Sequence, residues 1–420
     1  MSESKIAAHN ADIPSACGKH QDESKGLFAD FFASRIEFKA AWLILVVLFA
    51  FILIYPVATV LVQSFLRDGV ITLANWVETL SRPHFRQMLA NSFIVSGLSG
   101  LISALIAFFA AYGLTFTNVD RRTKKAVQIL LLLPLFLPSI TYGFAVIYSF
   151  GRLGLVSQIF GVLPFSIYGF WGLLIADVIY TLPPAFLILS NAFHYIDRNT
   201  ITVSRLMGDS PWRTFYISAL RPIVGALCSA FILSFFLSFT DFGIPVSIAG
   251  QYDVIATELY TTMMGAVPDF GNGAVIAIAM LVPSVAAVWL LKNAERLHFR
   301  YSQISTAPAM TNRLRDAGFY LYFLVLAFLL FSILAVVFIV PFVEYWPYKP
   351  YFTLQHIKEV LSDDGIGDLY LRSIGVAAAS AVVGTACAFA AGMIRSRSDM
   401  PGWCRTTMDA VAMLTSTLPG

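Results

Sequence analysis

Eight long apolar runs divide this chain, and no other feature limits its fold as much. Each run exceeds the roughly eighteen residues that a helix needs to cross a bilayer. Lipid offers no water to exposed backbone groups, so segments of this length become helices there. Strands of a membrane barrel need only about ten residues. The runs lie near residues 40–65, 92–116, 127–150, 171–193, 223–246, 273–292, 318–343 and 373–394, and a ninth begins near 408.

The composition excludes a soluble globular protein. Hydrophobic residues make up 58% of the 420 residues and charged residues only 13%, whereas soluble domains carry about 25% charged residues. One water-soluble core cannot hide so much apolar surface. We therefore expect an all-α polytopic membrane protein that contacts the lipid bilayer and binds no nucleic acid.

The Lys and Arg residues between the runs predict which side of the membrane each connection faces. With the N-terminus in the cytoplasm, connections on that side hold 21 of the 28 basic residues, and those on the opposite side hold 7. Cytoplasmic connections of membrane proteins carry such an excess. The bias favours a multi-pass protein with a cytoplasmic N-terminus.

One stretch of the sequence recurs later in the chain without a gap. Residues 72–138 and 353–419 share 14 identities in 67 positions. Thr72-Leu73, Glu78 and Leu80-Ser81 recur in a polar stretch, where chance matching is harder. The first copy has six runs, so both copies start on the same side and form a parallel repeat. We expect a cytoplasmic tail (1–39), a first unit of six spans (40–292), a cytoplasmic linker (293–317) and the start of a truncated second unit (318–420).

The connection at residues 194–222 predicts two short helices joined at Gly208. The residues before this glycine have helical spacing, and a glycine commonly ends a helix. Asp209 or Ser210 can cap a second helix, with Pro211 at its first position. Aromatic residues then give the second helix an apolar face. Such an element suits the docking of a soluble partner; an amphipathic interfacial helix without a partner is the alternative.

This connection resembles the signature of ABC importer permeases. In those proteins E-A-A, three residues and a glycine precede a hydrophobic second helix, and together they form a coupling helix that fits a cleft on the ATPase. Gly208 matches that glycine, and Ser210–Phe215 matches the common continuation, although Thr202-Val203-Ser204 replaces E-A-A. The resemblance implies that the ATPase-coupling residues are Thr202, Ser204, Arg205, Gly208, Asp209, Ser210, Pro211 and Trp212.

The tandem repeat is similar to a subfamily in which one polypeptide supplies both permease units, as in importers of ferric iron, thiamine and 2-aminoethylphosphonate. Leu133–Ser139 and Ser238–Pro245 resemble segments typical of that subfamily. Tyr180–Ala185 and Ser204–Asp209 are most similar to the 2-aminoethylphosphonate permeases. The resemblance implies a tandem repeat of six-span type I permease units in the bacterial inner membrane. It also implies import of a small solute, with 2-aminoethylphosphonate as the first expectation and ferric iron as the alternative.

The resemblance also implies two protein partners, a periplasmic solute-binding protein and a cytoplasmic ABC ATPase dimer. The chain has no glycine-rich phosphate loop that ends in Gly-Lys-Ser/Thr. ATP and Mg²⁺ would therefore be bound by the partner ATPase, and this chain would need no cofactor. Its six histidines form no cluster with metal-ligand spacing, and no nucleophile motif stands out. We expect a transporter subunit, not an enzyme, with no catalytic and no metal-binding residues.

Four residues are candidates for a translocation path or hinge, namely Pro138, Pro183, Pro184 and Asp241. Proline breaks the helical hydrogen-bond ladder, so we expect these prolines to interrupt their spans where irregular backbone can face a cavity. Ordinary tolerance of proline in membrane helices is the alternative. Asp241 could instead cap a helix break, and we expect Asp177 to be a snorkelling or hydrogen-bonded carboxylate.

Two other classes of protein remain open. A secondary transporter with a tandem repeat would need ionisable residues at mid-membrane as relays, and Asp177 and Asp241 are the main ones inside the runs. A membrane-embedded enzyme would need clustered His, Asp or Glu residues there, and the sequence shows no such cluster. Loss of uptake on collapse of the proton gradient at constant ATP would favour the secondary transporter.

Overall fold

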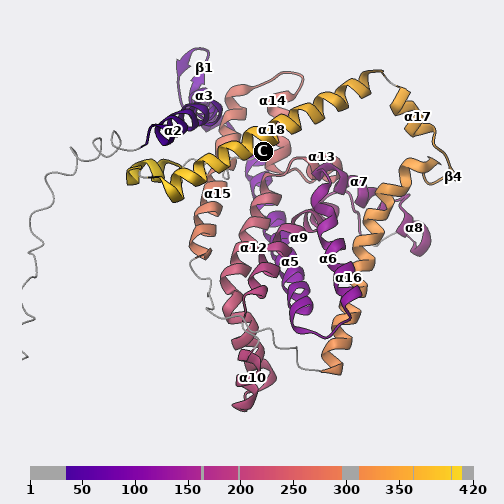
Figure 1. The fold of residues 1–420 in the computed structure, drawn as a ribbon. Coiled ribbons are helices and arrows are strands. Elements are labelled where there is room, and N and C mark those ends of the chain that lie inside the picture. Colours follow the sequence, from indigo (N-terminus) through magenta and orange to yellow (C-terminus); the bar gives the residue numbers. More distant parts are fainter. Residues whose placement is uncertain are drawn as a thin grey trace, which may run out of the picture. The chain divides into compact units, whose positions relative to one another are not determined.

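The computed structural model describes residues 35–161, 165–196, 199–295, 312–362, 364–398 and 400–408. Most of the expected tail, most of the linker and nearly all of the ninth run lie outside these residues. Eight helices in the described part are long and apolar enough to cross a membrane (Figure 1). Each of them overlaps one of the eight predicted runs, so the all-α polytopic fold is confirmed. The spans are Ile36–Ser64, Pro83–Phe116, Ser139–Ile159, Phe170–His194, Pro211–Thr240, Phe270–Ala294, Arg313–Phe342 and Gly365–Arg397.

The described residues form two units. Unit 1 takes its residues from 1–56 and 369–415, and unit 2 takes its residues from 57–368. In unit 1, Leu45, Ile394 and Met408 form a small buried core. The elements of this unit are α2 (Ile36–Phe49), the π-helical turn η1 (Ala50–Ile54) and most of α18 (Asp364–Arg397).

Unit 2 holds the larger core and both short hairpins. In the hairpins, β1 pairs antiparallel with β2 and β3 with β4. The elements are α3 (Tyr55–Ser64), β1 (Leu66–Arg67), β2 (Val70–Ile71), α4 (Ala74–Ser81), α5 (Pro83–Phe116), α6 (Arg121–Leu132), the 3-10 turn η2 (Leu133–Phe136), α7 (Ser139–Phe150), α8 (Leu155–Phe160), α9 (Phe170–His194), α10 (Asn199–Leu206), α11 (Pro211–Phe215), the π-helical turn η3 (Tyr216–Leu220), α12 (Arg221–Thr240), α13 (Gly243–Ile248), α14 (Ile255–Met264), α15 (Phe270–Glu295), α16 (Arg313–Ile339), the 3-10 turn η4 (Val340–Phe342), β3 (Val343–Tyr345), β4 (Lys349–Phe352) and α17 (Gln355–Ser362).

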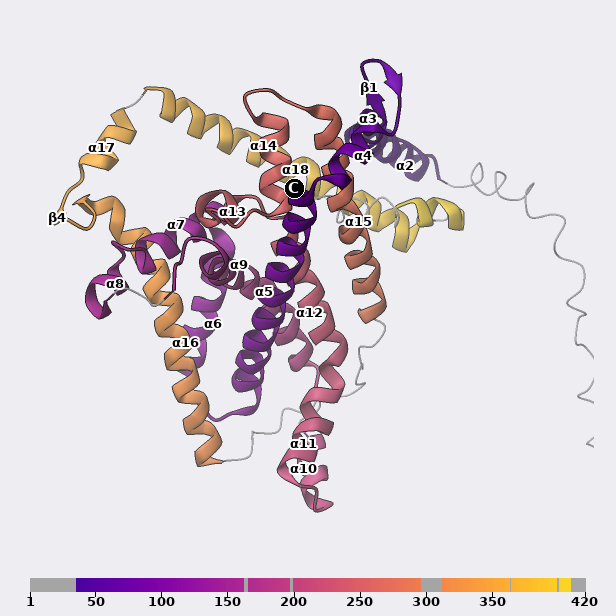
Figure 2. The ribbon, with the colours of Figure 1, turned by 180° about the vertical axis from the view of Figure 1, so that it is seen from behind.

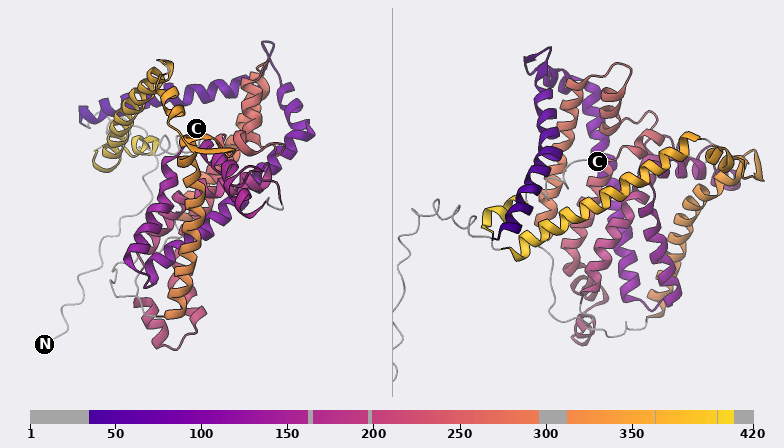
Figure 3. Two further views of the ribbon diagram at one scale, coloured as in Figure 1. Left: turned by 90° about the vertical axis from the view of Figure 1, so that its right-hand side faces the viewer. Right: turned by 45° about the horizontal axis from the view of Figure 1, so that its top comes forward.

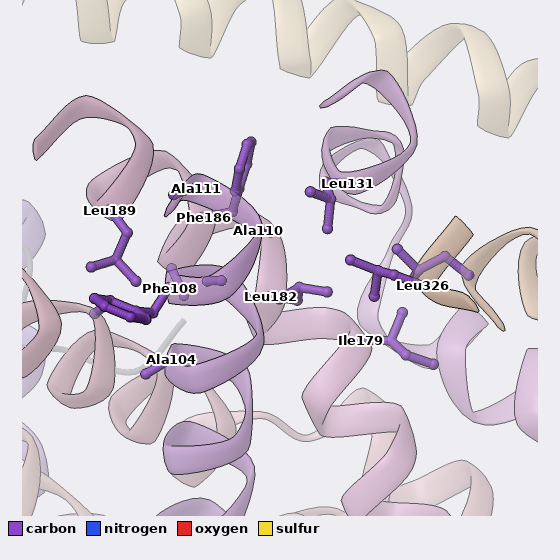
Figure 4. Packing of buried hydrophobic residues seen from close by; sticks show 14 of the residues in the cluster. Ala104, Phe108, Ala110, Ala111, Leu131, Ile179, Leu182, Phe186, Leu189 and Leu326 are labelled. Carbon is purple, nitrogen blue, oxygen red and sulfur yellow. The ribbon is translucent and has the colours of Figure 1, made fainter. Parts of the chain in front are cut away.

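Helices α5, α9 and α12 pack against one another at the centre of unit 2. Small residues on α5 let its neighbours approach closely. At Gly100, a Cβ atom would lie 3.0 Å from the backbone nitrogen of Phe235 on α12. Figure 4 shows bulky side chains of α9, α6 and α16 that point toward the small residues of α5. The labelled members of this core are Ala104, Phe108, Ala110, Ala111, Leu131, Ile179, Leu182, Phe186, Leu189 and Leu326.

Helix α16 opens the expected second repeat, yet it packs within unit 2 against α6 and α7 (Figure 3). The Tyr322 hydroxyl donates to the Ile106 carbonyl oxygen at 2.8 Å. The ring of Phe319 lies 5.5 Å from that of Tyr112, centroid to centroid. The first helix of the expected second repeat therefore covers the helices of the expected first repeat.

The prolines act differently in two spans. The predicted run 127–150 is not one helix, because α6 ends before η2 and α7 begins only after Pro138. Pro138 has no N–H to continue the ladder, and the Pro134 carbonyl oxygen accepts a bond from the Tyr142 hydroxyl instead. Helix α9, by contrast, continues through Pro183 and Pro184. The expectation that these two prolines interrupt their span is wrong, since a packed membrane helix tolerates the loss of two ladder bonds.

Element bounds recur in the register of the sequence repeat. Helix α4 (74–81) corresponds to α17 (355–362), and the alignment of the two copies matches both bounds. Helix α5 (83–116) corresponds to α18 (364–397) in the same register. Each pair follows an antiparallel hairpin whose second strand ends directly before the repeated segment, at Ile71 or at Phe352. These positions are compatible with the predicted tandem repeat.

Candidate functional site

The connection between α9 and α12 folds into α10, α11 and η3, which we call the loop element (residues 199–220). Figure 2 shows α10 and α11 at the tip of unit 2 beyond α12, at the end opposite β1. The predicted pattern of two short helices joined at Gly208 is therefore confirmed.

Gly208 makes the turn between the two short helices. Its φ angle is +80°, in the left-handed region that glycine adopts without strain. The Gly208 N–H donates to the Arg205 carbonyl oxygen at 3.0 Å, and the Asp209 N–H donates to that of Ser204 at 3.1 Å. These bonds satisfy the last carbonyls of α10. No atom lies within 4 Å of where a Cβ of residue 208 would be, so the backbone conformation, and not a lack of space, favours glycine here.

Ser204 joins the two short helices from the inside. Its side chain is buried, and its hydroxyl donates to Asp209 Oδ2 at 2.7 Å and lies 3.1 Å from the Thr214 hydroxyl. Asp209 Oδ1 pairs with Arg213 Nε at 3.1 Å. Ser210 caps α11 by accepting from the Arg213 N–H at 3.4 Å. Of the two predicted caps, Ser210 is therefore the one used, and Asp209 fixes the turn.

The outer surface of the loop element is apolar. Leu206, Met207 and Trp212 are 82%, 79% and 71% exposed. Thr202 and Arg205 are exposed beside them, and Pro211 begins α11 as predicted. Exposed apolar side chains that gather at one place mark a surface that contacts another protein or the membrane interface.

The inner surface of the loop element meets an aromatic cluster. The Phe215 ring lies 5.5 Å from Tyr112 and 6.1 Å from Phe108, both on α5. Phe193 at the end of α9 lies 5.4 Å from Phe108. Large packed rings resist compression. A displacement of the loop element would therefore be passed on to α5 and α9.

Two carboxyl groups lie deeper in the bundle. Asp241 lies at the break between α12 and α13, where the Ile244 N–H donates to its Oδ2 at 2.8 Å. Asp177 on α9 is only 2% exposed, and its Oδ2 accepts from the Ser238 hydroxyl at 2.6 Å. The Ser238 oxygen is also 3.1 Å from that of Ser96 on α5. Asp177 is therefore a hydrogen-bonded carboxyl, and the snorkelling expectation is wrong because its side chain points between helices.

The predicted path residues do not all meet. Asp241 shares one small cavity with Asp177, whereas no proline of the predicted set lines it. Sequence reasoning also missed Ser96 and Ser238 as partners of Asp177. The available signal was the helical spacing of buried serines on α5, which lie at Ser92, Ser96, Ser99 and Ser103.

Part of this chain is similar to known membrane transport proteins. Residues 103–297 match the model of a family described as the binding-protein-dependent transport system inner membrane component. Over 255 residues, the chain is 28% identical to the putative ferric transport system permease protein of Haemophilus influenzae, covering 59% of this chain and 40% of that protein. Over 253 residues, it is 28% identical to the ferric transport system permease protein of Actinobacillus pleuropneumoniae, covering 58% and 36%. The match thus spans about two fifths of the length of these relatives.

A solved structure shares the fold. One chain of a bacterial ABC transporter involved in the import of the acidic polysaccharide alginate superposes with a TM-score of 0.52 and 18% identity, covering 65% of this chain and 98% of that chain. This likeness concerns the fold. The segment of residues 103–297, which contains the loop element and Asp177, is similar to the binding-protein-dependent transport system inner membrane components.

Proposed function

We propose that this chain is a permease of a bacterial ABC importer and that its loop element docks a cytoplasmic ATPase. The observation that carries the proposal is the helix–Gly208–helix element with its exposed apolar surface. The excess of basic residues in the same set of connections supports a cytoplasmic position for this surface. ATP and Mg²⁺ would be bound by the ATPase, and this chain would carry out no covalent chemistry.

The aromatic cluster supports a mechanical route from the ATPase to the bundle. Closure of an ATPase pair would move the loop element, and Phe215 would transmit that movement to α5 through Phe108 and Tyr112. Because packed interfaces are bistable, a small displacement can switch the bundle between two arrangements. A binding protein would deliver the solute at the opposite face, near β1 and α4.

Ferric iron is the first substrate to test. Two relatives that match this chain over more than 250 residues are ferric transport permeases by name. The expected 2-aminoethylphosphonate becomes the second substrate to test, because only short sequence segments favour it. Uptake of radiolabelled iron and of the phosphonate by cells that express the complete importer would separate the two.

Gly208 provides the test of the docking role. Aspartate, like asparagine, adopts left-handed backbone more readily than other residues, so the main effect of Asp at this position would be to place a negative charge on the apolar surface. We expect Gly208→Asp to lower co-purification of the chain with its ATPase at least tenfold, while membrane insertion is retained. Gly208→Asn is the matched control, because asparagine tolerates this conformation.

Two results would contradict the proposal. Undiminished co-purification of the Gly208→Asp variant would remove the docking role of the loop element. Uptake that stops when the proton gradient is collapsed at constant ATP would favour a secondary transporter instead of an ATP-driven importer.

A further inference from the structure

Two carboxyl groups border one small cavity at the centre of unit 2. Asp177 on α9 and Asp241 at the α12–α13 break both line it, together with Ser92, Ser96 and Ser238. The volume of the cavity is about 10 Å³, which is room for a single water-sized particle. An organic solute does not fit, so any occupant is a water molecule or a small ion.

Asp177 has no counter-charge. One carboxyl oxygen accepts from the Ser238 hydroxyl, and the other, Oδ1, has no hydrogen-bond partner among the described residues. None of the ion pairs within the described part of the chain includes Asp177 or Asp241. A buried carboxylate without a compensating charge is costly, and a second carboxyl nearby increases that cost.

Among the described residues, two tyrosine hydroxyls interact with the carboxyl groups of the cavity. Tyr180 on α9 and Tyr142 on α7 lie close enough to Asp241 to sense its charge. Neither phenol can supply a positive charge, and the Tyr142 hydroxyl already donates to the Pro134 carbonyl oxygen. Any positive charge that balances Asp177 and Asp241 must therefore come from a bound species.

We propose that this cavity binds one small monovalent metal cation of the size of Na⁺, held by the carboxyl groups of Asp177 and Asp241. Oxygens of Ser96 and Ser238 complete a set of hard oxygen ligands, which select hard cations over soft ones such as Cu(I). No group of three His, Cys, Asp or Glu residues that could hold a metal ion occurs in the described residues. Mg²⁺ would keep several water molecules, for which a cavity of about 10 Å³ has no room.

The ion would connect the three central helices. Ser96 lies on α5, Asp177 on α9 and Ser238 on α12. A shared cation between them would stabilise the packed arrangement of the bundle beside the α12–α13 break. The proposal concerns binding and does not depend on which solute the protein transports.

Thermal unfolding of the purified full chain in detergent tests the site. Unfolding midpoints would be compared in NaCl and in N-methyl-D-glucamine chloride at equal ionic strength and constant pH. We expect the midpoint to rise by about 2 °C or more as Na⁺ increases from roughly 1 to 100 mM, and the rise to saturate, because a ligand that binds only the folded state stabilises it. Equal midpoints in the two salts would overturn the proposal.

Matched variants test whether the Na⁺-dependent rise of the unfolding midpoint comes from this cavity. Asp177→Asn keeps the shape of the side chain and should abolish the Na⁺-dependent shift, whereas Asp68→Asn, at an exposed aspartate outside the cavity, should retain it. If Asp177→Asn does not fold, Ser96→Ala replaces it and should weaken Na⁺ binding. Direct ²³Na NMR of the unmodified chain should show exchange with a bound state. A midpoint that follows pH but not Na⁺ would mean that a proton occupies the site, and would reject the metal cation.

Discussion

Single polar side chains fix several contacts between the helices of unit 2. The Thr79 hydroxyl on α4 donates to Asn272 Oδ1 on α15 at 2.9 Å. The hydroxyls of Ser103 on α5 and Thr181 on α9 are 2.8 Å apart. Each bond contributes only about 1 kcal/mol, but an unsatisfied partner in a buried site would cost more. Such pairs therefore select one way of packing the helices.

Glu78 on α4 gathers three partners at the β1 end of unit 2. Its carboxylate pairs with Arg82 and, at 2.9 Å, with Arg67, and it accepts from Asn272 Nδ2 at 3.4 Å. The bond from Arg82 is the main cause that holds the pKa of Glu78 below its ordinary value. A lowered pKa stabilises the fold above the unfolded-state pKa, and the effect is lost as pH falls through the folded-state pKa.

Glu78→Gln should therefore lower the unfolding midpoint slightly at pH 7, through a loss of roughly 1 kcal/mol or less, as is typical of an exposed ion pair. The difference from the unmodified chain should begin to shrink as the pH falls below about 4.3, the ordinary value for glutamate, and should vanish below the lowered folded-state pKa of Glu78. Thermal unfolding over a pH series measures this. Glu258→Gln is the control, because Glu258 forms no ion pair within the described residues. Equal pH dependence in both variants would contradict the role of Glu78.

Predictions for single residues succeeded where a side chain bonds to backbone only a few residues away. Ser210, Pro211 and Gly208 act within a few residues of themselves, so capping and turn rules were enough to place them. The partners of Asp177 could not be predicted. They come from α5 and α12, and they depend on how each helix is rotated about its axis. The proposed cation site escaped sequence reasoning for the same reason.

At the scale of elements, the close contact between α5 and α12 depends on which glycine of α5 lies against the backbone of α12. A Cβ at Gly100 would lie 3.0 Å from the Phe235 nitrogen and 3.2 Å from the Phe231 carbonyl oxygen, both backbone atoms of α12. At Gly97, one turn earlier on the same helix, no atom lies within 4 Å. The two glycines are neighbours in sequence but face different surroundings.

Gly100→Ala should destabilise the protein by about 1–3 kcal/mol, because the added methyl group forces α5 and α12 apart. Gly97→Ala should be neutral or stabilising by up to about 1 kcal/mol, since alanine is the better helix former. Thermal unfolding of both variants measures the difference. Similar effects at the two positions would show that α5 and α12 are not packed as described.

The ends of helices could be predicted at prolines only where no distant helix stabilises the broken turn. Pro138 ends one helical stretch as expected, since η2 and α7 meet there. Pro183 and Pro184 have the same chemistry, yet α9 continues through them. Packing of α9 against α5, α7 and α12 holds it helical. A sequence pattern cannot report this support, because it comes from helices distant in the chain.

At the scale of the whole molecule, the repeat relates two helices with different surroundings. Phe108 on α5 is 3% exposed and packs on Phe193 and Phe215. Phe389 lies at the corresponding position of the second copy, on α18, and is 71% exposed. The order and length of elements follow from the sequence repeat, but the burial of a given position does not.

Phe108→Ala should destabilise the chain by about 3–5 kcal/mol, because it removes a packed ring from the centre of unit 2. Phe389→Ala should change the stability by no more than about 0.5 kcal/mol, as expected for an exposed side chain. Thermal unfolding in detergent compares the two. A large loss at Phe389 would reveal packing on α18 that the exposure of its side chain does not indicate.

Five residues of π-helix, Tyr216–Leu220, join α11 to α12. A π turn accommodates one residue more than α-helical bonding does. Because the π turn takes up its extra residue within that one turn, deleting the residue would restore α-helical bonding with little rotation of α10 and α11 about the helix axis. The direction in which Trp212 and Met207 face outward is thus nearly independent of the extra residue. A loop of this kind can gain or lose one residue at its base without turning its contact surface away from a partner.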